Sequence, residues 1–374
     1  MNTASPTQTS ISVDRAMSRR LLTDKLFEKL MTFGGLSVIV AVSAIFVYLV
    51  SVVVPLFMPP GVEHRQQFAT PGGDAQTTLS LTGEEQREIG SRVGAGGAIT
   101  FFKFATGEQI AQTQVPVPAG ATITSADIGE RRSFAQGFGL SDGRVILVKQ
   151  SFAVSFPNNK RVITPALEYP VGEAPVSVDP QGKPIKLLGI QQSEEGSTLA
   201  AVTEDGRLLL SAVNVSTNAM TGETKSEVQQ SEIPSAPVGI RQLLIESKQR
   251  ELYVLHGERK LARFNISNKS SPVLLETIDL APADQKVTAL TMLSGGFSLI
   301  VGTDKGALSQ WFPVRTEGAN FALKQIRDFK SMPAGITAMS AEFFRKGFIV
   351  GDSSGNLGSY FATSQRQLLS LIHI

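Results

Sequence analysis

A polar turn that ends in glycine and leads into a strand-like segment recurs between residues 97 and 355. The copies "SDGRVILVKQSF" (141–152) and "EDGRLLLSAVNV" (204–215) show it most clearly. Successive anchor residues of the turn lie 46, 63, 53, 47 and 49 residues apart, which is the repeat length of β-propeller blades. The anchors are Gly97, Gly143, Gly206, Arg259, Gly306 and Gly355. This periodicity predicts a divergent β-propeller.

Strand-like segments occupy the rest of each repeat. An alternating segment stands about 17 residues before each anchor, a second apolar segment precedes the turn, a third follows it, and a variable fourth, such as 322–329, completes the unit. Four antiparallel strands per repeat make a propeller blade. We therefore expect an all-β fold with at least six four-stranded blades, and seven in the complete protein. The predicted first strands are 77–81, 124–128, 185–190, 241–246, 287–292 and 336–341.

The segment from Phe33 to Met58 carries no charged residue and is rich in Val, Ile, Leu and Phe. About 20 such residues cross the hydrocarbon core of a bilayer. The alternatives are a secretory signal peptide and a buried core helix. A signal peptide has a shorter apolar region with a small-residue cleavage site, and a core helix is seldom apolar on every face. The segment is therefore predicted to be a retained transmembrane helix.

Basic residues precede this span, whereas residues 61–80 contain only Arg65. The positive-inside rule places the N-terminus in the cytoplasm and the chain from about Val62 onward in the periplasm of a bacterial inner membrane. Residues 14–31 allow two interpretations: a helix along the membrane surface, or a helical extension of the span. The basic residues are Arg15, Arg19, Arg20, Lys25 and Lys29.

The predicted organisation has five parts. They are a cytoplasmic tail with a basic helix (1–32), the transmembrane helix (33–58), a linker (59–76), an incomplete periplasmic propeller (77–368) and a non-native tail (369–374). The tail "LSLIHI" can be translated from a transposon end that is common in sequencing libraries. We therefore expect a truncated reading frame.

The stretch "GDSSG" (351–355) matches the G-x-S-x-G pattern of a hydrolase nucleophile. A nucleophile elbow needs a strand before the serine and a helix after it. Here "GFIV" (347–350) and "NLGSYF" (356–361) both read as strands, and "GTDKG" (302–306) fills the same hairpin one repeat earlier. Ser353 is therefore predicted to be a turn residue without a catalytic role.

The sequence shows no other pattern that indicates a catalytic, cofactor-binding or metal-binding site. The chain has no cysteine, a net charge of +2 and 18% charged residues, which argues against thiol chemistry and against nucleic acid as a partner. His64 and His256 lack metal-ligand spacing and are expected at the surface, and His373 falls in the non-native tail. Trp311 stands where other repeats have Phe102, Phe264 and Tyr360, a repeated structural position. No catalytic, cofactor-binding or metal-binding residue is predicted, and the chain is not expected to be an enzyme.

Three parts of the chain follow one another: "DKLFEKLM" (24–31), the span "GGLSVIVAVSAIFVYLVSVVVPLF" (34–57) and a propeller with WD-repeat-like periodicity. This order resembles that of one known family. It resembles the N-terminal part of the large-form permease subunit of bacterial phosphate-specific ABC importers. The resemblance implies a role in inorganic phosphate import across the inner membrane. It also implies as partners the membrane, a periplasmic phosphate-binding protein, and the second permease and ATPase subunits, which would bind a permease core missing from this sequence. No transport residue can be carried over.

Two other function classes remain open. A membrane-anchored periplasmic propeller could be a scaffold for envelope protein assembly. Quinone-dependent dehydrogenases are also built on propellers, but the repeated tryptophan of their blades is absent, since Trp311 is the single tryptophan here.

Overall fold

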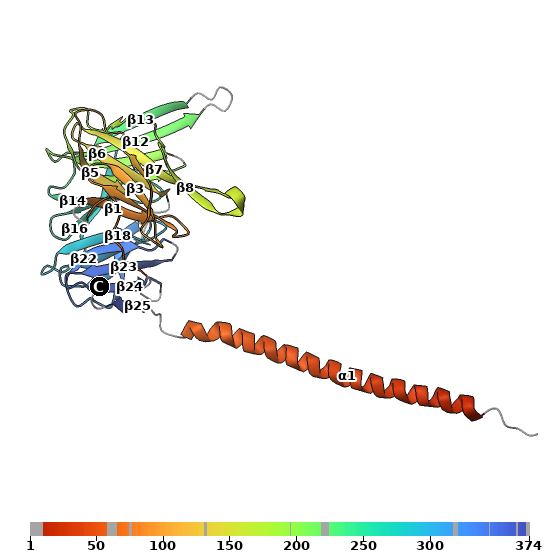
Figure 1. Cartoon of the computed structure of the whole chain (residues 1–374). Coiled ribbons are helices and arrows are strands. Elements are labelled where there is room, and N and C mark those ends of the chain that lie inside the picture. Colours follow the sequence, from red (N-terminus) through yellow and green to blue (C-terminus); the bar gives the residue numbers. More distant parts are fainter. Residues whose placement is uncertain are drawn as a thin grey trace, which may run out of the picture. The chain divides into compact units, whose positions relative to one another are not determined.

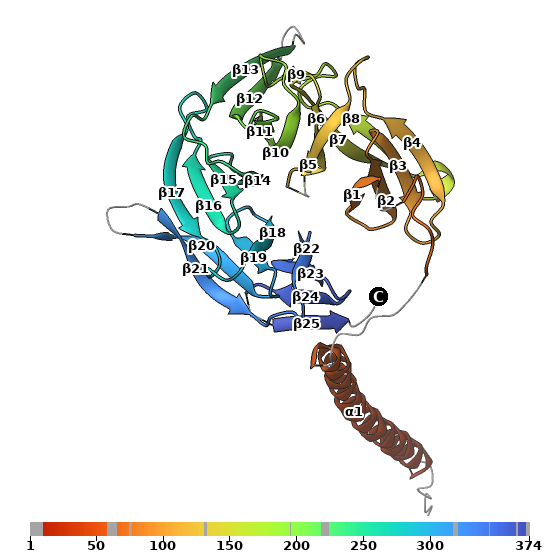
Figure 2. The same ribbon diagram turned by 90° about the vertical axis from the view of Figure 1, so that its left-hand side faces the viewer.

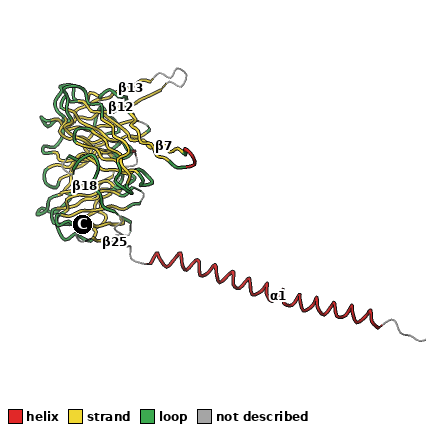
Figure 3. The backbone as a smooth tube through the Cα atoms, in the orientation of Figure 1, coloured by secondary structure: helices red, strands yellow, loops and turns green. Residues whose placement is uncertain are grey.

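The computed structural model describes residues 10–57, 66–74, 77–130, 133–194, 196–217, 224–316, 321–343, 345–363 and 366–371. The chain divides into two compact units, Met1–Gly61 and Val62–Ile374. The first is helical and the second is built from strands (Figures 1 and 3).

The helical unit consists of α1 (Ser10–Val53, 44 residues) and the short 3-10 helix η1 (Val54–Phe57). Its part from Arg20 to Val53 is long and apolar enough to cross a membrane. The basic residues and the apolar segment lie in one unbroken helix. Of the two interpretations of residues 14–31, the helical extension therefore agrees with the structure.

The second unit is a six-bladed β-propeller, and each blade is an antiparallel sheet of four consecutive strands. Blade 1 contains β1 (Thr78–Gly83), β2 (Ile89–Gly94), β3 (Ala98–Lys103) and β4 (Gln109–Gln114). Blade 2 contains β5 (Ile123–Ile128), β6 (Ala135–Leu140), β7 (Arg144–Ser155) and β8 (Val162–Glu168), and β9 (Val176–Ser177) pairs with β7 as a fifth strand. Blade 3 contains β10 (Ile185–Ser193), β11 (Gly196–Thr203), β12 (Leu208–Thr217) and β13 (Thr224–Glu232).

The remaining blades repeat this plan. Blade 4 contains β14 (Ile240–Ile245), β15 (Glu251–His256), β16 (Lys260–Asn265) and β17 (Val273–Asp279). Blade 5 contains β18 (Val287–Met292), β19 (Leu299–Thr303), β20 (Leu308–Arg315) and β21 (Phe321–Phe329). Blade 6 contains β22 (Ile336–Ala341), β23 (Gly347–Asp352), β24 (Leu357–Phe361) and β25 (Arg366–Leu371). The predicted strands 287–292 and 336–341 coincide with β18 and β22, and residues 372–374 lie outside the described part of the chain.

The blades follow one another around a common centre, with the first strand of each blade innermost (Figure 2). Neighbouring blades bury apolar side chains between their sheets, and five core clusters join blades 1–2, 2–3, 3–4, 4–5 and 5–6. Among the described residues no such cluster joins blade 6 to blade 1. In Figure 2 these two blades are not side by side as neighbouring blades are.

The anchor glycines confirm the predicted turns. Gly143 and Gly306, for example, have φ values of 79° and 81°, in the left-handed region that glycine adopts without strain. Blade 4 departs from this pattern, because Gly257 carries the positive φ in place of the predicted anchor Arg259. The turn between β15 and β16 therefore has a different geometry.

In the second strand of each blade, successive side chains face the neighbouring blades on opposite sides. In blade 5, Ile300 packs in the cluster shared with blade 6, and Val301 packs in the cluster shared with blade 4. Ile300 stands six residues before its anchor, and the residues at the same position elsewhere are Ser91, Gly137, Ala200, Tyr253 and Ile349. This position faces the next blade, as expected for a strand whose successive side chains point to opposite faces.

Candidate binding site at the centre of the propeller

Ser353 lies in the tight turn between β23 and β24, and its side chain is exposed. The carboxylate of the preceding Asp352 accepts hydrogen bonds from the amides of Ser354 and Asn356, both at 2.9 Å. Burial alone would raise the pKa of Asp352, but bonds from Asn356 and Ser354 hold it below its usual value. The acid beside the serine therefore stabilises the turn, which agrees with the prediction for Ser353.

The histidines and Trp311, which the sequence offered as candidates, do not form a site among the described residues. His256 ends β15, one residue before the predicted turn, and is half-buried; burial, followed by the charge of Lys260, lowers its pKa. Trp311 lies in β20, packs on the core between blades 4 and 5, and donates to Ser309 Oγ at 3.0 Å. His64 and His373 lie outside the described residues. Within the described part of the chain, no three acidic or histidine side chains are grouped to hold a metal ion.

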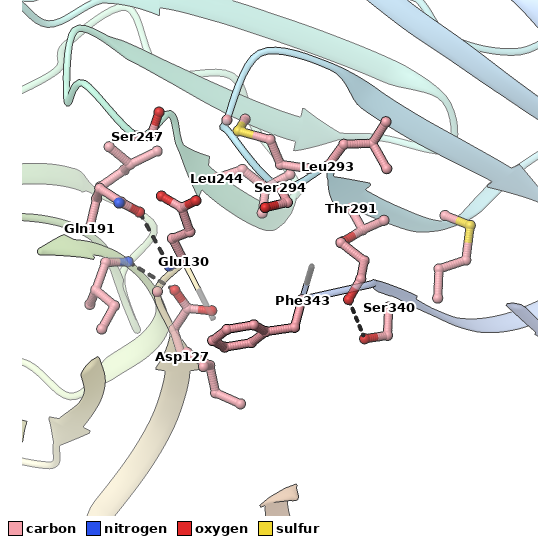
Figure 4. A pocket seen from close by; sticks show the side chains of 18 of the residues that line it. Asp127, Glu130, Gln191, Leu244, Ser247, Thr291, Leu293, Ser294, Ser340 and Phe343 are labelled. Atoms are coloured by element: carbon pink, nitrogen blue, oxygen red, sulfur yellow. Dashed lines mark hydrogen bonds between the residues drawn. The ribbon is translucent and has the colours of Figure 1, made fainter. Parts of the chain in front are cut away.

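A cavity of about 210 Å³ lies where the inner strands of blades 2 to 6 converge, and we call it the central cavity. Its walls are the ends of β5, β10, β14, β18 and β22 with the loops that follow them (Figure 4). Apolar side chains supply most of the lining; they include Ile128, Ile190, Leu244, Met292, Met339 and Phe343. Convergent polar groups in an apolar cavity are typical of a ligand site.

Asp127, near the end of β5, is a partly exposed acid in this wall. Its Oδ2 atom accepts a hydrogen bond from the amide of Ile190 in blade 3 at 2.9 Å. Burial raises the pKa of Asp127 to about 7, although hydrogen bonds from the amides of Ile190 and Ile128 oppose the rise. The carboxyl group is therefore protonated more readily than that of an ordinary surface aspartate.

Two loops from non-neighbouring blades meet over the central cavity. The ring of Phe134, after β5, lies 5.7 Å from the ring of Phe343, after β22. Glu130 accepts a hydrogen bond from the amide of Gly295 in blade 5 at 3.4 Å, and its own amide donates to Gln191 Oε1 at 3.3 Å. Blade 2 therefore contacts blades 3, 5 and 6 at the centre of the ring.

A second cavity, also of about 210 Å³, lies between the inner strands of blades 1 and 2, and we call it the side cavity. It shares Asp127 and Ile128 with the central cavity. Gln136 of β6 lines it, is only 3% exposed and donates to Ser80 Oγ at 3.4 Å. The Oε1 atom of Gln136 is buried and accepts no hydrogen bond from the protein.

None of these residues was predicted from the sequence to form a site. Asp127 falls in the predicted strand 124–128, where a single acid between Ala126 and Ile128 gave no sign of a shared cavity. Its hydrogen-bond partner Ile190 is 63 residues away in the chain. The sequence of β5, which also contains Thr124 and Ser125, carries no local signal of this contact.

No known family model matches the chain, and no curated protein matches it significantly. Among solved structures, Raptor from Chaetomium thermophilum is 14% identical with a TM-score of 0.49; the match covers 79% of this chain and 24% of that one. This chain thus spans about a quarter of the length of that protein. The β-propeller domain of Cps50 (Swd1) from Myceliophteria thermophila is 13% identical with a TM-score of 0.40, covering 74% of this chain and 81% of that one.

Proposed function

We propose that this chain is the N-terminal anchor and periplasmic propeller of the permease subunit of a phosphate ABC importer. The observation that carries the proposal is the order of its parts: one basic helix continues into a charge-free apolar stretch, and a six-bladed propeller follows. The same order is the basis of the sequence resemblance. The proposal gives the chain no catalytic role.

The proposed topology places the N-terminus in the cytoplasm and the propeller in the periplasm. The basic residues before Phe33, among them Lys25 and Lys29, support this orientation. Alkaline phosphatase is active only in the periplasm, so a fusion after Gly107 should be active. Activity of a cytoplasm-only reporter at Gly107 would contradict the orientation.

Phosphate uptake tests the role itself. Disruption of the gene in its bacterial host should abolish high-affinity uptake of radiolabelled phosphate under phosphate starvation, and the intact gene on a plasmid should restore it. As a matched control, uptake of an unrelated substrate through another ABC importer should not change. Normal phosphate uptake by the disrupted strain would contradict the proposal.

The second candidate is a membrane-anchored scaffold for envelope protein assembly. It is favoured by the sheet face of blade 6 at Ile349, which is 46% exposed among the described residues although the equivalent positions in the other blades are covered. An exposed apolar sheet face is a surface that a protein partner can cover. Envelope defects together with normal phosphate uptake in the disrupted strain would favour the scaffold.

A further inference from the structure

The third strands of blades 2, 3 and 5 are longer than those of the other blades. β7, β12 and β20 have 12, 10 and 8 residues, whereas β3 and β16 have 6 and β24 has 5. Because consecutive strands of a blade are antiparallel, every third strand ends at the same face of the ring. We call it the hairpin face; its turns include 104–108, 156–161 and 266–272. The β7–β8 and β12–β13 strand pairs project from it on the same side of the propeller (Figure 1).

Exposed apolar side chains gather at the hairpin face. The turn between β7 and β8 carries Phe156, which is 65% exposed. Val273 and Phe321, the first residues of β17 and β21, are exposed at the same face. At the opposite face, the exposed large apolar residues within the described part of the chain are Leu79 and Val238. An exposed apolar surface of this kind marks contact with a membrane or with another protein.

Basic side chains accompany the apolar residues of these hairpins. Lys160, in the same turn as Phe156, and Arg315, at the end of β20, are exposed. Neither forms an ion pair with another described residue. The acids Glu130 and Glu342 line the central cavity instead of the hairpin tips. Lysine is depleted in protein–protein interfaces, whereas basic groups beside apolar ones suit the boundary between lipid headgroups and acyl chains. The combination favours a lipid surface.

The chain enters the propeller at this same face. Phe68 packs over Gly107 in the turn between β3 and β4, where a Cβ atom would lie 2.5 Å from the phenyl ring. In the chain, residues 58–65 separate Gln66 from Phe57, the last residue of η1. The nine steps between Phe57 and Gln66 reach at most about 32 Å. A bilayer crossed by α1 is therefore within reach of the hairpin face.

We propose that the hairpin face docks on a lipid bilayer, with Phe156 at the tip of the β7–β8 hairpin inserted among the lipid headgroups. The bilayer is the one that α1 crosses in the proposed topology. The proposal therefore rests on the proposed membrane anchor, and it does not depend on phosphate transport. A weak contact is enough, because the short connection to α1 keeps the face at a high effective concentration near the lipid. The loops around the central cavity lie at the same face, so docking turns them toward the bilayer.

The test uses the full chain, one copy per nanodisc, in a bilayer of dioleoylphosphatidylcholine and dioleoylphosphatidylglycerol. Since the chain has no cysteine, a single introduced cysteine carries a nitroxide label at one known site. Electron paramagnetic resonance then compares two accessibilities of the label. Oxygen concentrates in the bilayer, and a nickel chelate stays in water, so a high oxygen-to-nickel ratio identifies a label in lipid.

Three variants place the label. Phe156→Cys puts it at the tip of the β7–β8 hairpin, and Phe321→Cys puts it at the same face of blade 5. Val238→Cys is the matched control, because Val238 is 93% exposed at the opposite face. We expect the oxygen-to-nickel ratio to be several-fold higher at residue 156 than at residue 238, and higher at residue 321 than at residue 238. Far-UV circular dichroism and the fluorescence of Trp311 check that each variant keeps the fold.

An equal ratio at residues 156 and 238, with the chain retained in the nanodisc, overturns the docking and leaves the anchor in place. A label at residue 156 that is shielded from both oxygen and nickel also overturns it, because protein and not lipid then covers the tip. A ratio at residue 321 no higher than at residue 238 overturns docking of the whole face. Loss of the chain from nanodiscs during size-exclusion chromatography overturns the anchor and the docking together. Phosphate uptake tests the transport role separately.

Discussion

Within the described part of the chain, blades 1 and 6 each have one sheet face without a neighbouring blade, and the two faces differ in how far they are covered. On blade 1, residues 66–74 cover this face, and Phe68 packs edge-on against Phe102 at 6.0 Å. Beneath this cover Arg92 is 1% exposed and donates to the carbonyls of Gly72 and Asp74 and to the hydroxyls of Thr77 and Thr78. On blade 6, Ile349 is 46% exposed at the position that faces the next blade elsewhere.

The difference shows that the repeat determines which way a side chain points, and that the surroundings determine whether it is buried. Ile300 and Ile349 are the same residue at the same position of consecutive blades, yet Ile300 is fully buried against blade 6. A sheet face without a neighbouring blade is buried only where another segment of the chain packs on it, as residues 66–74 do on blade 1. The comparison can be tested position by position.

The largest effect is expected at Ile300. Ile300→Ala should lower the free energy of unfolding by about 3 kcal/mol, because it leaves a cavity between blades 5 and 6. Ile349→Ala should cost less than about 1 kcal/mol, since much of that side chain already contacts solvent. Urea unfolding of the full chain in detergent, followed by Trp311 fluorescence, measures both. Equal losses would mean that the outer face of blade 6 is covered in solution.

Removal of Arg92 tests the cover on blade 1. Arg92→Met should cost about 2 kcal/mol, because it removes the hydrogen bonds by which the buried guanidinium group holds Gly72, Asp74 and the two threonines. Arg144→Met, at a half-exposed arginine paired with Asp142, is the matched control and should cost less than about 0.5 kcal/mol. The same urea titration applies. A similar small loss in both variants would show that residues 66–74 do not need Arg92.

A smaller effect is expected from the aromatic contact of the same cover. Phe68→Ala should cost about 1 kcal/mol, since it removes the edge-on contact with Phe102. It should also speed proteolysis within residues 66–74, with cleavage sites read by mass spectrometry. Unchanged cleavage of this segment would contradict its dependence on Phe68.

The smallest change in stability is expected for Ile349→Lys, within about 0.5 kcal/mol of the parent protein. Its effect should be on association, because an exposed apolar sheet face favours contact with another copy. Sedimentation velocity of the full chain in detergent should show less oligomer for Ile349→Lys than for the parent. An equal oligomer fraction in both would assign any association to another surface.

The sequence predicted the strands well because their signals are local. Alternation and an anchor glycine lie within about 20 residues of each other, and β18 and β22 have the predicted ends. The short β9 was not predicted, since its two residues, Val176 and Ser177, pair with a strand about 30 residues earlier and carry no pattern of their own.

The candidate site could not be predicted in the same way. Asp127, Gln191 and Phe343 meet only after several blades have packed around one centre, and no spacing in the sequence encodes that meeting. Residues 66–74 likewise belong to the predicted linker 59–76, yet they pack on blade 1. Contacts of this kind depend on how blades and connecting segments pack against one another rather than on local pattern.

The length of the unbroken helix α1 exceeds the thickness of a bilayer. With a rise of about 1.5 Å per residue, its 44 residues extend for about 66 Å, roughly twice the hydrocarbon thickness of a bilayer. The residues before Phe33 make up about half of that length. In the proposed topology this half is a rigid spacer in the cytoplasm, and a partner bound at its start would be held about 35 Å from the hydrocarbon boundary.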